Sequence, residues 1–108
     1  MIDENFKDKL LNLSVSGIYV YDLEKGINIY INRQYTSLTG YTIDVLNAMS
    51  QEEFFGLFHP DDQAAVGAHM EEVVNSKEGE IIEIEYRFKK ADGTWMWCLS
   101  RDAIFNRN

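Results

Sequence analysis

The sequence has little of what marks a secreted or membrane-inserted chain. It contains one cysteine, Cys98, in 108 residues, so no internal disulfide can form, which fits a reducing compartment. Its apolar runs extend over a few residues, far short of the ~20 needed to cross a bilayer, and no charged-then-apolar signal peptide opens the chain. We therefore expect a cytoplasmic domain without direct membrane contact, in a parent protein that could be membrane-anchored elsewhere.

Basic residues are also scarce. Ten Lys and Arg stand against 18 Asp and Glu, for a net charge of -8. A field of this sign repels phosphate backbones and anionic lipid surfaces, so nucleic acid is not an expected partner. The hydrophobic content of 45% and aromatic content of 13% supply one core but not two. One compact domain is expected.

Residues 1–13 are predicted to form an amphipathic helical extension in front of this domain. Phe6 and Leu10 stand four residues apart with Leu13 alongside, and charged residues occupy the rest of the wheel. This apolar stripe must be covered, either by the sheet or by a partner chain.

Local patterns after residue 13 predict the order hairpin, helices, hairpin. Gly26 supplies the positive φ of a tight turn, Asn32 and Thr42 can cap helices, and Pro60 suits the first position of a longer helix. The predicted elements are strands at 18–22 and 27–31, helices at 33–39 and 42–49, an irregular or one-turn segment at 50–59, a helix from 60 to about 75, and strands at 82–88 and 95–105.

Several predicted strands carry apolar residues on both faces. Trp95, Trp97 and Leu99 alternate with Met96 and Cys98 along the last strand. A sheet of this kind must be covered twice. The fold class expected is α+β, an antiparallel sheet with helices on one face, and the other face is left for the N-terminal helix, a partner subunit or both.

Short segments in a fixed order support a more specific prediction. They are Gly17–Asp22, Ile31–Asn32, Leu38–Tyr41, Phe58–Asp62, Glu85–Phe88, and Asp92–Thr94 followed by Trp97. Together they resemble the PAS domain family, in the variant with His-Pro-Asp-Asp at the start of the long helix. The resemblance covers residues 14–108 and implies a five-stranded antiparallel sheet whose helices enclose a cavity, which in some members holds haem, flavin or a metabolite.

The resemblance fails at the end of the chain, where the fifth strand of the family is absent. In the family that strand lies between the first and the fourth, so the domain at 14–108 is expected to be truncated before it. Unpaired edges are normally paired or covered. We expect the two edges to meet directly, or a segment of a neighbouring chain to fill the gap; a boundary set too early in the sequence is the favoured cause.

Aromatic and apolar side chains provide the candidate ligand cavity. The candidates are Tyr35, Phe54, Phe58, Val66, His69, Met70, Tyr86 and Trp97. An alternative of equal weight is that these residues fill a close-packed core, because a pocket and a core look alike in sequence.

Cofactor and catalytic signals are weak. His69 lies on the apolar stripe of the long helix and is the candidate axial ligand for haem, but a packed helix residue is the favoured interpretation. Light-sensing flavin chemistry needs a cysteine that residues 41–60 lack. Cys98 is interpreted as a small hydrophobe. We therefore expect no cofactor as purified, no metal site and no catalytic residues.

The resemblance implies a non-catalytic sensory input module of a larger signalling protein. Its parent would be a sensor histidine kinase of a two-component system, or a cyclic dinucleotide enzyme such as a diguanylate cyclase. The module would bind a small ligand in the helix–sheet cavity and relay the signal to an output domain. The alternative is a ligand-free dimerisation module. In either case a homodimer is expected through Phe6, Leu10, Leu13 and the outer sheet face.

Overall fold

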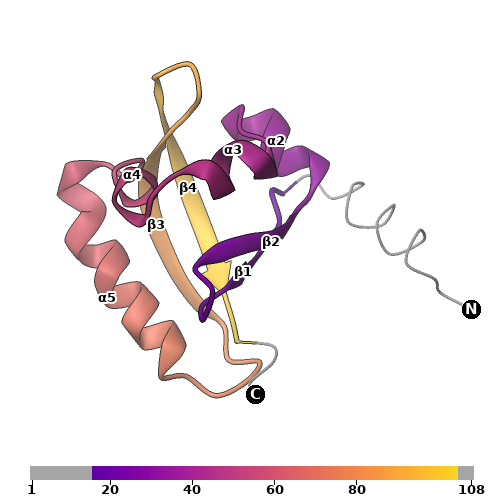
Figure 1. Cartoon of the computed structure of the whole chain (residues 1–108). Coiled ribbons are helices and arrows are strands. Elements are labelled where there is room, and N and C mark those ends of the chain that lie inside the picture. Colours follow the sequence, from indigo (N-terminus) through magenta and orange to yellow (C-terminus); the bar gives the residue numbers. More distant parts are fainter. Residues whose placement is uncertain (1–15, 105–108) are drawn as a thin grey trace, which may run out of the picture.

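The computed structural model describes residues 16–104, and its elements follow the predicted order (Figure 1). The predicted α+β class, with antiparallel strands and helices, is confirmed. The bounds are β1 Tyr19–Asp22, β2 Ile27–Ile31, α2 Arg33–Thr39, α3 Ile43–Ala48, α4 Gln51–Phe55, the 3-10 helix η1 Pro60–Asp62, α5 Gln63–Val74, β3 Ile82–Lys89 and β4 Trp95–Asp102. The predicted N-terminal helix, with Phe6, Leu10 and Leu13, lies outside the described residues.

The strands form two separate antiparallel hairpins. The β3–β4 hairpin pairs without a register shift from Ile82↔Asp102 to Lys89↔Trp95. The β1–β2 hairpin has an irregularity between Val20 and Tyr21. In Figure 1, α5 runs along the β3–β4 hairpin and α3 lies beside β2, in agreement with the contacts between these elements.

Strand β1 does not pair with β4 in the described part of the chain. The expectation that the first and fourth strands meet directly is therefore wrong. Side chains span the gap instead, because the Tyr19 hydroxyl donates to Asp102 and lies 3.3 Å from the Ser100 hydroxyl. That a neighbouring chain supplies a strand here stays a prediction.

The outer edges of both hairpins are covered by the chain itself. The Asn28 amide donates to the Asn47 side chain at 2.9 Å, and the Asn47 side chain donates to the Asn28 carbonyl at 2.8 Å. Beside β3, the His59 amide donates to the Arg87 carbonyl at 3.0 Å, and the Lys89 amide donates to the Leu57 carbonyl at 2.8 Å. These contacts cover Asn28 on β2 and the end of β3 near Arg87 and Lys89. The facing edges of β1 and β4 have no strand partner among the described residues, and unpaired edges of this kind invite association.

A cluster of aromatic rings forms the core between the hairpins. Phe58 lies 5.4 Å from Phe88 and 5.1 Å from Tyr86, ring centre to ring centre. Phe54 of α4 contacts this cluster and also stacks on Tyr21 of β1, at 6.4 Å. Offset and edge-to-face ring pairs contribute beyond their buried area. The rings therefore fasten the two hairpins to each other at one end.

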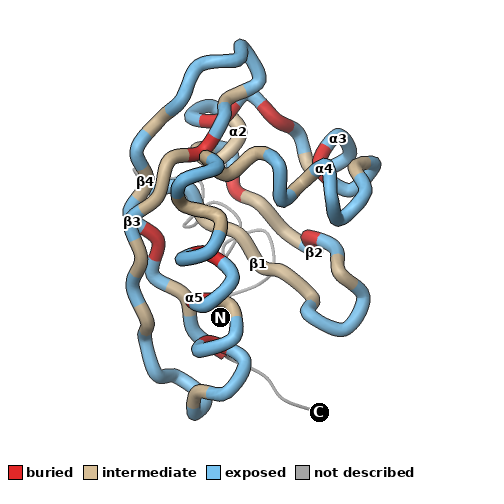
Figure 2. The backbone as a smooth tube through the Cα atoms, turned by 90° about the vertical axis from the view of Figure 1, so that its left-hand side faces the viewer, coloured by how far each residue is buried: buried red, intermediate tan, exposed pale blue. Residues whose placement is uncertain are grey.

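Helix α5 covers the inward face of the β3–β4 hairpin. Val66, His69 and Val73 are buried, and Met70 is half-buried, so the stripe predicted from the sequence faces the strands. Figure 2 shows the buried residues as short, separate stretches of the backbone, on helices as well as strands.

The opposite face of the same hairpin is open in the described residues. Trp95, Trp97 and Leu99 are 42%, 67% and 58% exposed. The Arg87 guanidinium lies 5.0 Å from the Trp97 ring, which is a cation–π distance. The prediction that this sheet has two apolar faces is therefore confirmed for β4.

Helix α2 docks on the turn between β3 and β4 through a close backbone contact. The Ala91 amide donates to the Thr39 carbonyl at 2.8 Å. Gly40, which ends the helix, has a φ of 83°, and a Cβ there would lie 2.8 Å from the Ala91 Cβ. Only glycine suits both the left-handed backbone and the close approach.

Asn32 is the most buried side chain described, at 1% exposure, and links β1 to α2. Its oxygen accepts from the Ile18 amide at 2.8 Å and the Tyr35 amide at 2.9 Å, and its amide donates to the Ser16 carbonyl at 3.0 Å. Truncation would leave buried amides without partners.

We predict that Asn32→Ala lowers the free energy of unfolding by about 2–4 kcal/mol, because two partly buried amides and one carbonyl lose a hydrogen bond to a buried side chain. Urea titration followed by circular dichroism measures this. Thr42→Ala is the matched control, since it removes an exposed helix cap and should cost about 1 kcal/mol or less. A loss no larger for Asn32→Ala than for Thr42→Ala would contradict the assigned role.

An ion pair joins the start of α5 to β3. The Arg87 Nη2 and Nε atoms lie 2.9 Å and 3.0 Å from the two carboxylate oxygens of Asp62, and the Arg87 amide donates to that carboxylate at 2.8 Å. The side-chain and backbone hydrogen bonds from Arg87 lower the pKa of Asp62 from 3.8 to about 2.

A lowered carboxyl pKa stabilises the fold above the unfolded value of 3.8, and this contribution is lost as pH falls from about 4 to about 2. We predict that Asp62→Asn reduces the acid-induced fall of the urea midpoint in that window. Urea titrations at several pH values between 2 and 6, chosen about one unit apart around the pKa of an aspartate, measure the slope. Asp61→Asn is the control, and its urea midpoint should fall with pH as steeply as that of the unsubstituted chain. An unchanged slope in Asp62→Asn would refute the assignment.

Candidate functional site

A groove of about 650 Å³ lies between β1 and β4. Its walls come from the segment 16–19 at the start of β1, from α2, from Tyr86 of β3 and from Met96–Asp102 of β4. The two hairpins diverge here because no backbone pairing joins them. The groove therefore lies between the first and fourth strands, where the family resemblance described above implies a further strand.

Four polar side chains meet at one end of the groove. The Asp102 carboxylate accepts from the Tyr19 hydroxyl on one oxygen. On the other oxygen it accepts from the Ser100 hydroxyl at 2.9 Å, and it lies 2.7 Å from His69 Nε2. The side chains of His69 and Asp102 are 6% and 16% exposed. We refer to Tyr19, Ser100, His69 and Asp102 as the polar cluster.

The polar cluster joins three elements around one carboxylate. An ionised carboxylate only accepts hydrogen bonds, so in a contact with one the proton lies on His69 Nε2 and His69 is the donor from α5. Asp102 therefore lies between the helix and the groove.

The phenols around the groove are kept protonated. Burial raises the pKa of Tyr35 and Tyr86, and burial together with the nearby Asp102 raises the pKa of Tyr19 well above its ordinary value. At neutral pH these groups are uncharged and can both donate and accept hydrogen bonds.

The body of the groove is aromatic and apolar. Tyr19 and Tyr35 meet edge to face with ring centres 6.0 Å apart. Met96 and Cys98 extend from β4 toward the same interior and are half-buried. Burial raises the pKa of the Cys98 thiol, which therefore stays protonated and apolar in behaviour.

The candidate residues from the sequence fall in three places. Tyr35 and Tyr86 line the groove, and Trp97 stands at its outer rim. The aromatic rings of Phe54 and Phe58 lie in the core instead. The remaining candidates, Val66, His69 and Met70, belong to α5.

His69 does not present a free imidazole to a haem. Its Nε2 contacts Asp102, and the residue is not part of the groove wall. The residues around the groove therefore do not fit an axially ligated haem. In residues 16–104 no group of three potential metal ligands occurs.

Sequence reasoning missed Tyr19, Ser100 and Asp102 as site residues. A signal for two of them was present, because side chains alternate between the two faces of a strand. That alternation puts Ser100 and Asp102 on the same face as Met96 and Cys98. The approach of Tyr19 across the gap has no local signal.

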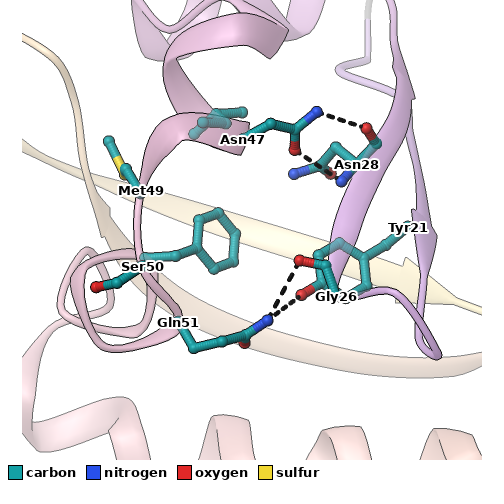
Figure 3. Close-up of a pocket in the computed structure, with 9 residues that line it drawn as sticks. Tyr21, Gly26, Asn28, Asn47, Met49, Ser50 and Gln51 are labelled. Atoms are coloured by element: carbon teal, nitrogen blue, oxygen red, sulfur yellow. Dashed lines mark hydrogen bonds between the residues drawn. The ribbon is translucent and has the colours of Figure 1, made fainter.

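A second, smaller pocket lies between the β1–β2 hairpin and α3–α4 (Figure 3). Gln51 donates to the Gly26 carbonyl at 3.2 Å and contacts the Tyr21 hydroxyl at 3.4 Å, next to the Asn28–Asn47 pair. Its volume of about 20 Å³ is enough for one water and no more. The polar contacts around this pocket join the β1–β2 hairpin to α3 and α4, so we assign them a structural role.

None of the helices described is long and apolar enough to cross a bilayer. Among known protein families, a model described as PAS fold matches residues 28–108 of this chain. A search of curated proteins returned no match.

We predict that Tyr19→Phe lowers the free energy of unfolding by about 1–2 kcal/mol, because it removes a donor from a charged, buried acceptor. Tyr21→Phe is the matched control, since within residues 16–104 its hydroxyl makes the long, exposed contact to Gln51, and its effect should stay within about 0.5 kcal/mol. Urea titration compares the two. Equal losses would show that the polar cluster does not fasten β1 to β4.

Proposed function

The chain belongs to the PAS fold family, and we propose that it is the sensory input module of a larger signalling protein, which binds a small ligand in the groove between β1 and β4. PAS domains are sensory and signalling modules in general, and the finer assignment rests on this groove. Its volume of about 650 Å³ falls within the ~300–1,000 Å³ typical of small-molecule sites.

The walls of this groove, which lies where the family fold has a further strand, combine two kinds of surface that a small ligand can use. Aromatic and apolar surface from Tyr35, Tyr86 and Met96 is combined with polar groups gathered at one end. Small-molecule sites commonly combine an apolar body with a few polar groups that fix orientation. We therefore assign the apolar body to affinity and the polar cluster to orientation.

The separation of the hairpins supports a relay of the signal. Side chains alone connect β1 to β4, so a ligand between them can change their relative position without breaking strand pairing. A ligand shifts such an equilibrium by its difference in affinity for the two arrangements. The open face with Trp95, Trp97 and Leu99 would pass the change to the rest of the parent protein.

We extend the proposal to the parent. The module would act without catalysis of its own in a sensor histidine kinase or a cyclic dinucleotide enzyme, as a homodimer in contact with an output domain. Its dimer interface would combine Phe6, Leu10 and Leu13 with the open sheet face. The exposed apolar side chains of β4 support an interface at this position.

A second candidate is a ligand-free dimerisation module. The observation that favours it is that Phe54 and Phe58, two of the candidate cavity residues, fill the core. A module of this kind would set the geometry of its output domains through the open sheet face alone.

Native mass spectrometry of the purified chain separates the two candidates. We predict a dimer that retains a small non-covalent mass, and Cys98→Phe should abolish retention because the larger side chain fills the groove. Cys98→Ala is the control that removes the thiol and keeps the space. A ligand-free dimer favours the dimerisation module, and retention that survives Cys98→Phe would contradict the location of the site.

A further inference from the structure

The open face of the β3–β4 hairpin is built from rows of two residues that pair across the strands. The rows are Lys89 with Trp95, Arg87 with Trp97, Glu85 with Leu99, and Glu83 with Arg101. We refer to the second as the Trp97 row. Paired residues of an antiparallel hairpin share one face, and α5 covers the other face (Figure 1). The side chains of these rows therefore form one surface, whose apolar members are exposed.

Most charges on this face are neutralised within the chain. Arg101 forms an ion pair with Glu83 of the same row. Arg87 forms one with Asp62, at 2.9 Å between Nη2 and the carboxylate. These two pairs leave the charge pattern of the face to the two rows on either side of the Trp97 row.

Lys89 and Glu85 carry the two remaining charges, one of each sign. Both side chains are exposed, and neither forms an ion pair within residues 16–104. Lys89 Nζ lies 6.0 Å from the centre of the Trp95 ring. The two residues stand four positions apart on β3, about 13 Å along the strand, with the Trp97 row midway between them. A rotation by half a turn about that row exchanges the two charges.

We propose that the partner of the open face is a second copy of this chain, packed face to face and antiparallel, with the two-fold axis at the Trp97 row. In this register Lys89 faces Glu85 of the second copy. Trp95 faces Leu99 of the second copy, and the two Trp97 rings meet at the axis. The inference rests on the dimer of the proposed function and adds the register of its interface.

The charge pattern favours a second copy over a different partner. A two-fold interface uses the same patch on both chains, so the patch must complement itself. The open face does so, because the rotation places its cation on its anion. The chain has a net charge of -8, but the charges of this face balance, so two acidic chains can meet here. A partner with charges of one sign would match Lys89 or Glu85 and be repelled by the other.

The same pattern favours the antiparallel over the parallel arrangement. A two-fold axis along the strands would place β3 over β4 of the second copy, with Lys89 over Trp95 and Glu85 over Leu99. Those positions would then form no ion pair across the interface. Sheets that pack face to face lie about 10 Å apart with nearly aligned strands, and the apolar side chains of β4 fill that space. The apolar side chains supply affinity, and the charges set the orientation.

Reversal of single charges tests the register. Lys89→Glu places carboxylates against Glu85 of the second copy at both ends of the interface, and Glu85→Lys places cations against Lys89. We expect each variant alone to weaken the dimer at least about tenfold in sedimentation velocity of the whole chain. The effect should shrink at about 1 M salt, where the screening length is about 3 Å. Both positions are exposed, so the variants should fold.

A mixture of the two variants is the decisive measurement. In the antiparallel register the mixed dimer has opposite charges at both ends, so its dissociation constant should lie within about threefold of that of the unsubstituted dimer. An isotope label on one variant lets native mass spectrometry distinguish the mixed dimer. The control is a mixture of Lys77→Glu and Glu72→Lys, which make the same changes of net charge at exposed positions outside this face. These variants should neither weaken the dimer nor favour mixed dimers.

Trp97→Lys tests the face itself, because it places two cations at the axis. We expect loss of the dimer in the same sedimentation experiment. Val45→Lys is the matched control, since Val45 is an exposed apolar residue of α3, outside the open face. It should leave the dimer unchanged.

The outcomes separate this inference from the proposed function. If Trp97→Lys removes the dimer but the charge variants do not weaken it, or their mixture does not restore it, the register is wrong while a dimer through the open face stands. If the dimer survives Trp97→Lys, or the unsubstituted chain is a monomer at high micromolar concentration, both the register and the open-face dimer fail. Residues 1–15 of the same chain are then the alternative cover. The ligand groove is decided separately, by the retained mass.

Discussion

No strand pairing joins the two hairpins in the described residues, so side-chain contacts and the backbone contact between α2 and the β3–β4 turn hold them together, and the rest of the structure depends on that constraint. At one end, aromatic rings from α4, from Phe58 and from β3 lie between the hairpins. At the other end, Asp102 gathers donors from β1, β4 and α5. Between these two fastenings the strands diverge and leave the groove.

The two fastenings differ in physical kind, and this difference matters for function. Ring contacts are apolar and non-directional in their main contribution, so they tolerate small rotations. The contacts at Asp102 are directional and lose their value when the donors move out of line. A molecule that changes the hydrogen bonding of Asp102 would therefore pivot the β1–β2 hairpin about the aromatic end.

Much of the fold was predictable because its signals are local. Asn32, Thr42 and Gly40 have the side chains or backbone freedom that begin and end short helices, and α2 and α3 lie where these residues predicted. Strand β3 follows directly from the alternation of its residues. The segment after Ser50 was harder, since it was predicted as irregular or one-turn and forms α4 with a capping box from Ser50 and Glu53.

The site was only partly predictable, because a cavity exists only where the side chains leave part of the space between the elements unfilled. Phe58 and Tyr86 are aromatic neighbours that both pack against the core, yet of the two it is Tyr86 that also lines the groove. No residue type encodes that difference. The contact of Tyr19 with Asp102 depends on how two distant hairpins approach each other, which appears only in three dimensions.

The close approach of Gly40 to Ala91 ties together two positions that are far apart in the sequence. A side chain at Gly40 would meet the Ala91 Cβ and push helix α2 away from the β3–β4 turn, which would break the bond between the Ala91 amide and the Thr39 carbonyl. During evolution these two positions are therefore not independent. Related chains should keep both residues small, and a chain that enlarges one of them needs a lengthened or rebuilt turn to survive selection.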